Sequence, residues 1–189
     1  MPDDQSGTTN DWMVDIETTG LRPDRAGILS IGAVQFDRRS FEPTGARFFT
    51  RLAMPESRAW DANTSAWWQQ QSPEAWAAAT AGDGLAPAAA LALLAEALGS
   101  APWFWSKPAH FDYPFVEGYF AEFGVKSPLH HRKVVDVRTW IATRPQDGQA
   151  AAAAFEALPF SGVVHDPTDD CLHALGMLRA ASMEAANVG

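Results

Sequence analysis

The chain has 189 residues, of which 47% are hydrophobic, and a formal net charge of −9. This length suits one globular domain and excludes a second full one. The single cysteine, Cys171, excludes a disulfide framework and a thiolate zinc cluster, and we interpret it as a buried apolar side chain in a protein of a reducing compartment. No apolar run can span a bilayer, and residues 1–10 do not resemble a secretory signal. We therefore expect a cytoplasmic protein without a membrane partner, and a disordered tail over residues 1–10.

The first half of the chain predicts strands followed by helices. Strands are expected over residues 12–16, 27–36 and 47–52, with Gly20 and Pro23 marking the first turn, and together they form an antiparallel meander. Helices are expected over residues 64–71, from Pro73 after Ser72 as N-cap, and over residues 85–98 before Gly99.

The second half predicts an alternation of strands and helices. Residues 102–106 read as a buried strand, and the aromatic stripe from Phe111 to Phe123 predicts a helix that ends at Gly124. Residues 134–137 predict a strand that runs into a helix through Ile141. A loop with an alanine-rich turn or helix is expected over residues 144–154, and a final helix over residues 170–186, introduced by Asp166 as N-cap. This order predicts an α/β layered domain with a mixed sheet.

Two carboxylates lie on the first predicted strand. Because side chains alternate along a strand, Asp15 and Glu17 face the same side of the sheet. Paired oxygen ligands on a rigid element suit Mg²⁺ or Mn²⁺. The alternative interpretation is an ordinary solvated strand terminus.

Two more acidic residues and one histidine stand at the starts of predicted helices. Asp112 follows the aromatic strand, where Pro114 helps to start a helix, so a simple N-terminal cap is the alternative. Asp170 lies in the first turn of the final helix. His165 precedes that helix in a loop and is free to point towards whatever Asp170 binds, although a loop histidine can also be an ordinary surface residue.

The order of these residues resembles the DEDDh family of 3′–5′ exonucleases. The resemblance rests on DIETTG at residues 15–20, on Phe111-Asp112 after the fourth strand, and on a histidine five residues before an aspartate at a helix start. Residues 15–37, 67–72 with Glu74, and 136–139 resemble in particular the branch of the mycobacterial exoribonuclease-like domain and the phage exonuclease A proteins. The resemblance covers about residues 12–178 and implies one exonuclease domain over residues 11–186. It also implies an RNase H-like fold with a central five-stranded mixed sheet flanked by helices, divalent-metal catalysis and often a homodimer.

The chemistry implied is hydrolysis of a phosphodiester bond with the help of two Mg²⁺ or Mn²⁺ ions. In this hypothesis Asp15 bridges both metals, Glu17 and Asp170 complete the ion beside the attacking water, and Asp112 supports the ion beside the leaving group. His165 takes a proton from the water as general base. The acidic balance is unusual for a protein that binds nucleic acid, but several of the acidic residues would hold cations.

Substrate contacts are expected around the 3′ end of single-stranded RNA or DNA. Trp67 and Trp68 are about 100° apart on a helix, so one belongs to the core and the other can stack on a terminal base. The family usually has a Gly-Asn pair shortly before its Phe-Asp, whereas this chain has WSKPAH at residues 105–110, where Lys107 is a candidate phosphate contact in place of the asparagine. The remaining candidates are Thr18, Thr19, Gly20, Phe111 and Arg138, together with Arg22 and Arg25.

Three alternatives remain open at this point. The first is the same chemistry on single-stranded DNA. RNA is favoured, but DNA stays open because contacts to the 2′-hydroxyl cannot be identified from the sequence. The second is a non-catalytic RNase H-like module that binds nucleic acid or protein. A missing acidic ligand or histidine would favour it, but the four carboxylates and His165 are all present. A small-molecule phosphohydrolase would use the same metals.

Overall fold

The computed structural model describes residues 10–143 and 157–186 and contains one five-stranded sheet. The strands follow the order β3-β2-β1-β4-β5 across the sheet. Their bounds are β1 Asp11–Thr18, β2 Ile28–Phe36, β3 Pro43–Arg51, β4 Trp103–Ser106 and β5 Val134–Asp136. β1 pairs antiparallel with β2 and β2 with β3, whereas β4 runs parallel to both β1 and β5. The predicted mixed sheet, antiparallel first and then parallel, is confirmed.

The helices occupy the predicted segments with small shifts. They are α1 Ala62–Trp68, α2 Pro73–Thr80, α3 Pro87–Leu98, α4 Ala109–Glu122, α5 Val137–Ala142 and α7 Pro167–Ala186. Ser72 caps α2 as predicted, since its hydroxyl accepts a hydrogen bond from the Ala75 amide at 3.1 Å. The prediction for residues 144–154 and most of the predicted tail, residues 1–9, lie outside the described residues. Asn10 is described, and its side-chain amide donates to the Leu98 carbonyl at 2.8 Å.

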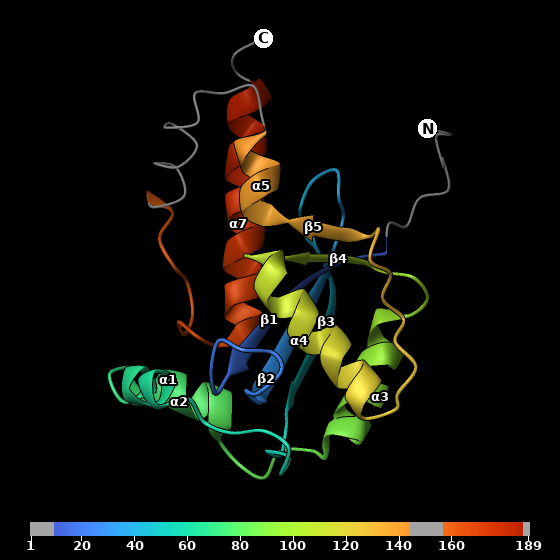
Figure 1. Ribbon diagram of the computed structural model, residues 1–189. Coiled ribbons are helices and arrows are strands. Elements are labelled where there is room, and N and C mark those ends of the chain that lie inside the picture. The colour runs from blue at the N-terminus through green and yellow to red at the C-terminus, as the bar shows by residue number, and fades with distance from the viewer. Residues whose placement is uncertain (1–9, 144–156, 187–189) are drawn as a thin grey trace.

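Two layers of helices cover the sheet, one on each face (Figure 1). On one face Trp12, Val14 and Ile16 of β1 pack against α3 and α4. On the other face Met13 and the fully buried Cys171 belong to a second core with α5 and α7. Odd-numbered residues of β1 therefore face α7, and this is the side to which Asp15 and Glu17 belong. Within the described residues, the helices are too short or too polar to cross a membrane.

A glycine allows the start of α7 to lie directly on the sheet. Gly32 is the β2 residue paired with Asp15. A Cβ atom at Gly32 would lie 2.5 Å from the carbonyl carbon of Pro167. Only a residue without a side chain lets the helix backbone approach this closely. Asp166 caps the helix as predicted, accepting from the Thr168 amide at 2.9 Å. The first turn of α7 is thereby fixed beside Asp15.

The start of α4 corrects one interpretation. The helix begins at Ala109, and Pro114 lies inside it, so Asp112 occupies the first turn and is not the N-cap. The Ala109 amide instead donates to Asp136 at the end of β5, at 2.9 Å. A cap supplied by a distant strand leaves no signal in the sequence around the helix, and it releases the Asp112 carboxylate for other contacts.

Candidate active site

The carboxylates of β1 lie at its C-terminal end, below the start of α7. Glu17 is buried and Asp15 is partly buried, on the same face of the strand. The chain turns there at the end of the DIETTG motif, where the Thr18 hydroxyl donates to the Gly20 carbonyl at 2.8 Å. The strand thus places two acidic side chains at the rim of the sheet.

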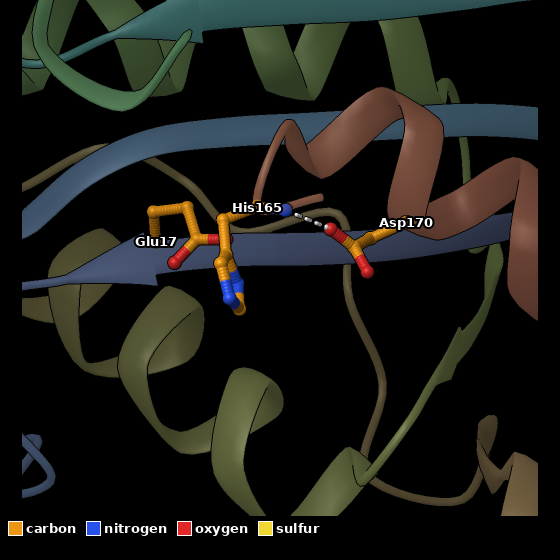
Figure 2. Close-up of side chains that lie close together, drawn as sticks. All are labelled: Glu17, His165 and Asp170. Carbon is orange, nitrogen blue, oxygen red and sulfur yellow. Dashed lines mark hydrogen bonds and ion pairs between the residues drawn. The ribbon is translucent and has the colours of Figure 1, made fainter. Parts of the chain in front are cut away.

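Asp170 and His165 meet Glu17 from the α7 side (Figure 2). The His165 amide donates to Asp170 Oδ2 at 2.8 Å, and His165 Nδ1 lies 3.5 Å from Glu17 Oε1. One possible ligand atom from each of the three residues lies within 4.8 Å of those from the other two. Glu17, His165 and Asp170 therefore form a group compact enough to hold a cation.

Asp112 reaches the same end of β1 from α4. Its Oδ1 accepts from the Ile16 amide at 3.1 Å, and its Oδ2 accepts from the Ser106 hydroxyl. The side chain is almost fully buried. A backbone donor from β1 and a hydroxyl from β4 thus fix the carboxylate between the two parallel strands.

The charges of the four carboxylates act on one another. Burial first, and then the charges of Asp112, Glu17 and Asp170, raise the pKa of Asp15 well above its ordinary value. Burial raises the pKa of Glu17 and that of Asp112 to about 7 each, and it also raises the pKa of Asp170. Like charges in a poorly solvated site favour protonation. A bound cation would relieve this repulsion and release protons.

Lys107 is the cation that acts against this repulsion at two of the carboxylates. Its charge lowers the pKa of both Asp15 and Asp170. The ammonium nitrogen also lies 3.8 Å from the sulfur of Met177 on α7. The position predicted as a phosphate contact is therefore beside the carboxylates, in the turn between β4 and α4.

The imidazole of His165 is held by aromatic rings as well as by Glu17. Its ring centroid lies 4.8 Å from that of Trp67 and 5.9 Å from that of Trp68, both edge to face. The hydrogen bond to Glu17 raises the pKa of His165 above its usual value. The backbone of His165 has φ of 67°, in the left-handed region that side chains rarely adopt. The residue is thus placed by its surroundings and not by local backbone preference.

A pocket of about 940 Å³ opens beside Glu17. Six of the predicted site residues line it, namely Glu17, Thr18, Gly20, Trp67, Trp68 and Phe111. Arg22 and Arg25 also line it, and both contact Asp24, at 3.2 and 3.7 Å. The pocket joins an acidic end to an aromatic and basic wall, a combination that suits a nucleotide.

The two neighbouring tryptophans divide their roles. Trp68 is buried and its indole donates to the Thr18 carbonyl at 3.1 Å, whereas Trp67 is 40% exposed. One ring therefore anchors α1 to the end of β1. The other is accessible for stacking.

Two predicted substrate contacts lie elsewhere. Thr19 is fully buried, and its hydroxyl donates to the Ala59 carbonyl and accepts from the Gly27 amide. It holds the turn after β1 and has no atom facing the pocket. Arg138 is exposed on α5 and does not line the pocket. The proposed substrate site therefore does not include Thr19 or Arg138.

The sequence interpretation missed part of the pocket wall. Trp60, Leu21 and Asp61 all line it. Asp61 also caps α1, accepting from the Thr64 amide at 2.9 Å, and this N-cap spacing was a readable signal. Trp60 lies in the loop before that helix, and its position depends on how the loop packs.

Comparisons with known proteins agree with this geometry. The family model described as the 3'-5' exoribonuclease Rv2179c-like domain matches residues 10–182. The fold is similar to that of E. coli exonuclease I in complex with a dA16 oligonucleotide, with a TM-score of 0.67, 15% identity, and coverage of 94% of this chain and 41% of that one. It is also similar to cell-death related nuclease 4, with a TM-score of 0.64, 15% identity, and coverage of 94% and 64%.

The chain thus spans about two fifths of exonuclease I and under two thirds of the cell-death related nuclease. No curated protein matches the sequence. At 15% identity the two structures speak for the fold alone, whereas the family model covers nearly the whole chain. The chain belongs to the family of Rv2179c-like 3'-5' exoribonuclease domains, and its fold is similar to that of exonuclease I.

Proposed function

We propose that residues 11–186 form a divalent-metal-dependent exonuclease domain that removes nucleoside 5′-monophosphates from the 3′ end of single-stranded RNA. The observation that carries this proposal is the meeting of Glu17, His165 and Asp170, whose possible ligand atoms lie within 4.8 Å of one another, with Glu17 also lining a pocket of about 940 Å³. Family membership supports the direction of cleavage.

The residues present fit divalent cations. Four carboxylates with raised pKa values meet at one end of the sheet, and oxygen ligands of this kind suit Mg²⁺ and Mn²⁺. Asp15, Glu17, Asp112 and Asp170 would hold two ions. When bound, such ions lower the pKa of a coordinated water and neutralise negative charge on the reacting phosphoryl group.

His165 is the proposed general base. Its hydrogen bond with Glu17 raises its pKa, which strengthens the imidazole as a proton acceptor. The Trp67 ring packs edge to face against the imidazole, and the hydrogen bond from the His165 backbone amide to the Asp170 carboxylate fixes the backbone of this residue beside Glu17, where we place the attacking water. The accepted proton then returns to solvent from this partly exposed side chain.

The pocket wall supplies the proposed substrate contacts. Trp67 and Phe111 offer aromatic faces to the terminal base, and Arg22 and Arg25 offer positive charge to its phosphates. Lys107 does not line the pocket, but its charge beside the carboxylates makes it a further candidate for a phosphate contact. Thr18 and Gly20 form the floor beside Glu17. With 14 basic against 23 acidic residues, the chain has little charge for a long grip, so we propose contacts to only a few nucleotides.

Oligonucleotides labelled at either end test this proposal. Incubation of 3′-labelled and 5′-labelled RNA with Mn²⁺ should release the 3′ label first and shorten the 5′-labelled strand in a ladder. EDTA should abolish both. Internal cleavage, or hydrolysis that persists in EDTA, would contradict the proposal.

Single-stranded DNA is the second candidate substrate. The structurally similar exonuclease I was solved with a deoxyadenosine oligonucleotide, which supports including DNA of identical sequence in the same experiment. A higher kcat/KM on DNA than on RNA would reassign the substrate without changing the chemistry. Cytoplasmic localisation and homodimer formation remain predictions from the sequence.

A further inference from the structure

A second cleft adjoins the active-site pocket. It has a volume of about 630 Å³, and we name it the tryptophan cleft after its lining residues Trp60, Ser65, Trp68, Gln69, Gln71, Ser72, Pro73 and Trp76. Trp60 and Trp68 line both hollows. The two spaces are therefore neighbours that share an aromatic wall, and a ligand that extends out of one can enter the other.

The residues that line the tryptophan cleft indicate which chemical class of ligand fits it. None of its described lining residues carries a charge, which makes it a poor site for a phosphate or a metal ion. Trp60 is 42% exposed and Trp76 is 41% exposed, although both rings are large and apolar. Gln69 and Ser65 add an uncharged amide and a hydroxyl to the lining as donors and acceptors. A flat, neutral, heteroaromatic group matches these features.

The spacing of the rings decides how such a group would lie. The ring centroids of Trp60 and Trp76 are 5.9 Å apart and the planes are tilted by 41°. A base inserted between two parallel rings needs about 7 Å, which is two contact distances of about 3.5 Å. The base must therefore stack on the outer face of one ring, while its edge faces the polar rim.

We propose that the tryptophan cleft binds an unpaired base of the substrate strand, upstream of the nucleotide that is removed. This inference rests on the proposed function, because the strand reaches the cleft from the active-site pocket past Trp60. It also explains how an acidic chain can bind a negatively charged strand. A chain with a net charge of −9 gains affinity by stacking, which does not depend on the release of counterions from phosphates.

Binding of oligonucleotides with one abasic nucleotide at successive positions tests the proposal. The measurements use the Asp170→Asn variant with Mg²⁺, so that the strand is not degraded. With the cleft intact, one abasic position upstream of the 3′ end should weaken binding about tenfold, which corresponds to about 1.4 kcal/mol for one stacked base. Added Trp76→Leu should weaken binding of the intact strand by a similar factor and abolish the effect of that abasic position.

Matched variants separate stacking from folding. Trp76→Phe keeps an aromatic face and should retain most of the effect, and Trp103→Leu replaces a tryptophan outside both hollows and should leave the abasic profile unchanged. If Trp76→Leu is poorly folded, Trp60→Leu takes its place, because Trp60 lies in a loop before α1. The increment lost in these variants should be nearly constant between low and high salt, unlike the affinity due to phosphate contacts.

The two proposals fail in different ways. A flat abasic profile, or one that neither tryptophan substitution alters, overturns the cleft inference even if the wild-type protein shortens RNA from the 3′ end. A wild-type protein that neither binds nor degrades the oligonucleotide overturns the proposed function first.

Discussion

Asp11 and Asp15 lie on the same strand and the same face of the sheet, four residues apart, but in different surroundings. Asp11 Oδ1 accepts from the guanidinium of Arg38 at 2.8 Å and from the indole of Trp105 at 2.7 Å. Asp15 faces three other carboxylates, and Lys107 is the cation that lowers its pKa.

The difference separates a structural carboxylate from a functional one. At the start of β1 the protein supplies the cation from its own sequence, so the buried charge is compensated in the absence of any ligand. At the other end the raised pKa values indicate that compensation is incomplete. An external cation is the simplest remaining source of positive charge. The predictions below test this contrast.

Removing a carboxylate from the acidic end should have the largest effect. Asp170→Asn, and separately Asp15→Asn, should lower kcat/KM by about 1000-fold or more, about 4 kcal/mol of transition-state stabilisation, because each proposed ligand anchors the ions that carry the chemistry. Single-turnover hydrolysis of a labelled oligonucleotide measures this. Activity within tenfold of wild type would remove that carboxylate from the site.

Replacing His165 should abolish proton transfer while leaving the carboxylates in place. His165→Ala should lower kcat by about 100-fold or more. Because the backbone at His165 has φ of 67°, His165→Asn is the better-matched variant, since asparagine tolerates this conformation. Calorimetric titration with Mn²⁺ should give similar affinities for both variants and wild type. Wild-type turnover in either variant would exclude His165 as the base.

Divalent metal should stabilise the folded protein. At 100 times its Kd a ligand adds about 2.7 kcal/mol, which for a protein of this size raises Tm by about 5–10 °C. Thermal unfolding with and without millimolar Mn²⁺ measures the shift, and Asp170→Asn should show a smaller one. A Tm indifferent to metal would argue against a metal site.

The opposite end of β1 should behave in the opposite way. Asp11→Asn removes the buried negative charge that accepts from the Arg38 guanidinium and the Trp105 indole, and we expect a loss of about 1–3 kcal/mol of stability. The increase in Tm on adding Mn²⁺ and the hydrolysis rate of the folded fraction should be unchanged. A loss of metal dependence in this variant would break the contrast between the two ends.

The metal-free protein should become less stable as pH rises from about 5 to 7. Glu17 and Asp112 have ordinary pKa values of 4.5 and 3.8 and folded values of about 7, so the native state holds more protons in this window. Folding is therefore favoured at the acidic side and the advantage is lost as pH passes the folded pKa. The raised pKa of His165 acts in the same direction.

Unfolding in EDTA at successive pH values measures this effect as a change of a few degrees in Tm. Glu17→Gln should flatten the profile. Stability that rises between pH 5 and 7 would show that the carboxylates are not buried as described.

The sequence predicted most elements because their signals are local. Ser72 before Pro73 and Asp166 before Pro167 mark helix starts, and the three early strands follow from β-prone runs between turn residues. The four carboxylates and His165 were predicted from the order of motifs, and the structure brings Glu17, His165 and Asp170 together, while their roles remain predictions. The contacts that join them depend on tertiary packing, which no local pattern encodes.

Two examples show where local signals end. Asp112 read as a possible cap because it stands near Pro114, yet Asp136 holds the start of α4 from a different strand. The contact between His165 and Glu17 depends on α7 lying against Gly32, and nothing around His165 in the sequence specifies this. Trp60 was missed because its position in the pocket wall depends on how the loop before α1 packs.

The packing of α7 on Gly32 brings together site residues from opposite ends of the chain. Asp15 and Glu17 come from the first strand, whereas His165 and Asp170 arrive only with the last helix and the loop before it. A chain shortened before Pro167 would lose Asp170 and the helix that packs beside His165, and local unfolding of α7 would remove Asp170 from the other carboxylates. The proposed nuclease activity would therefore depend on docking of the C-terminal helix, and a copy without a docked helix should be inactive.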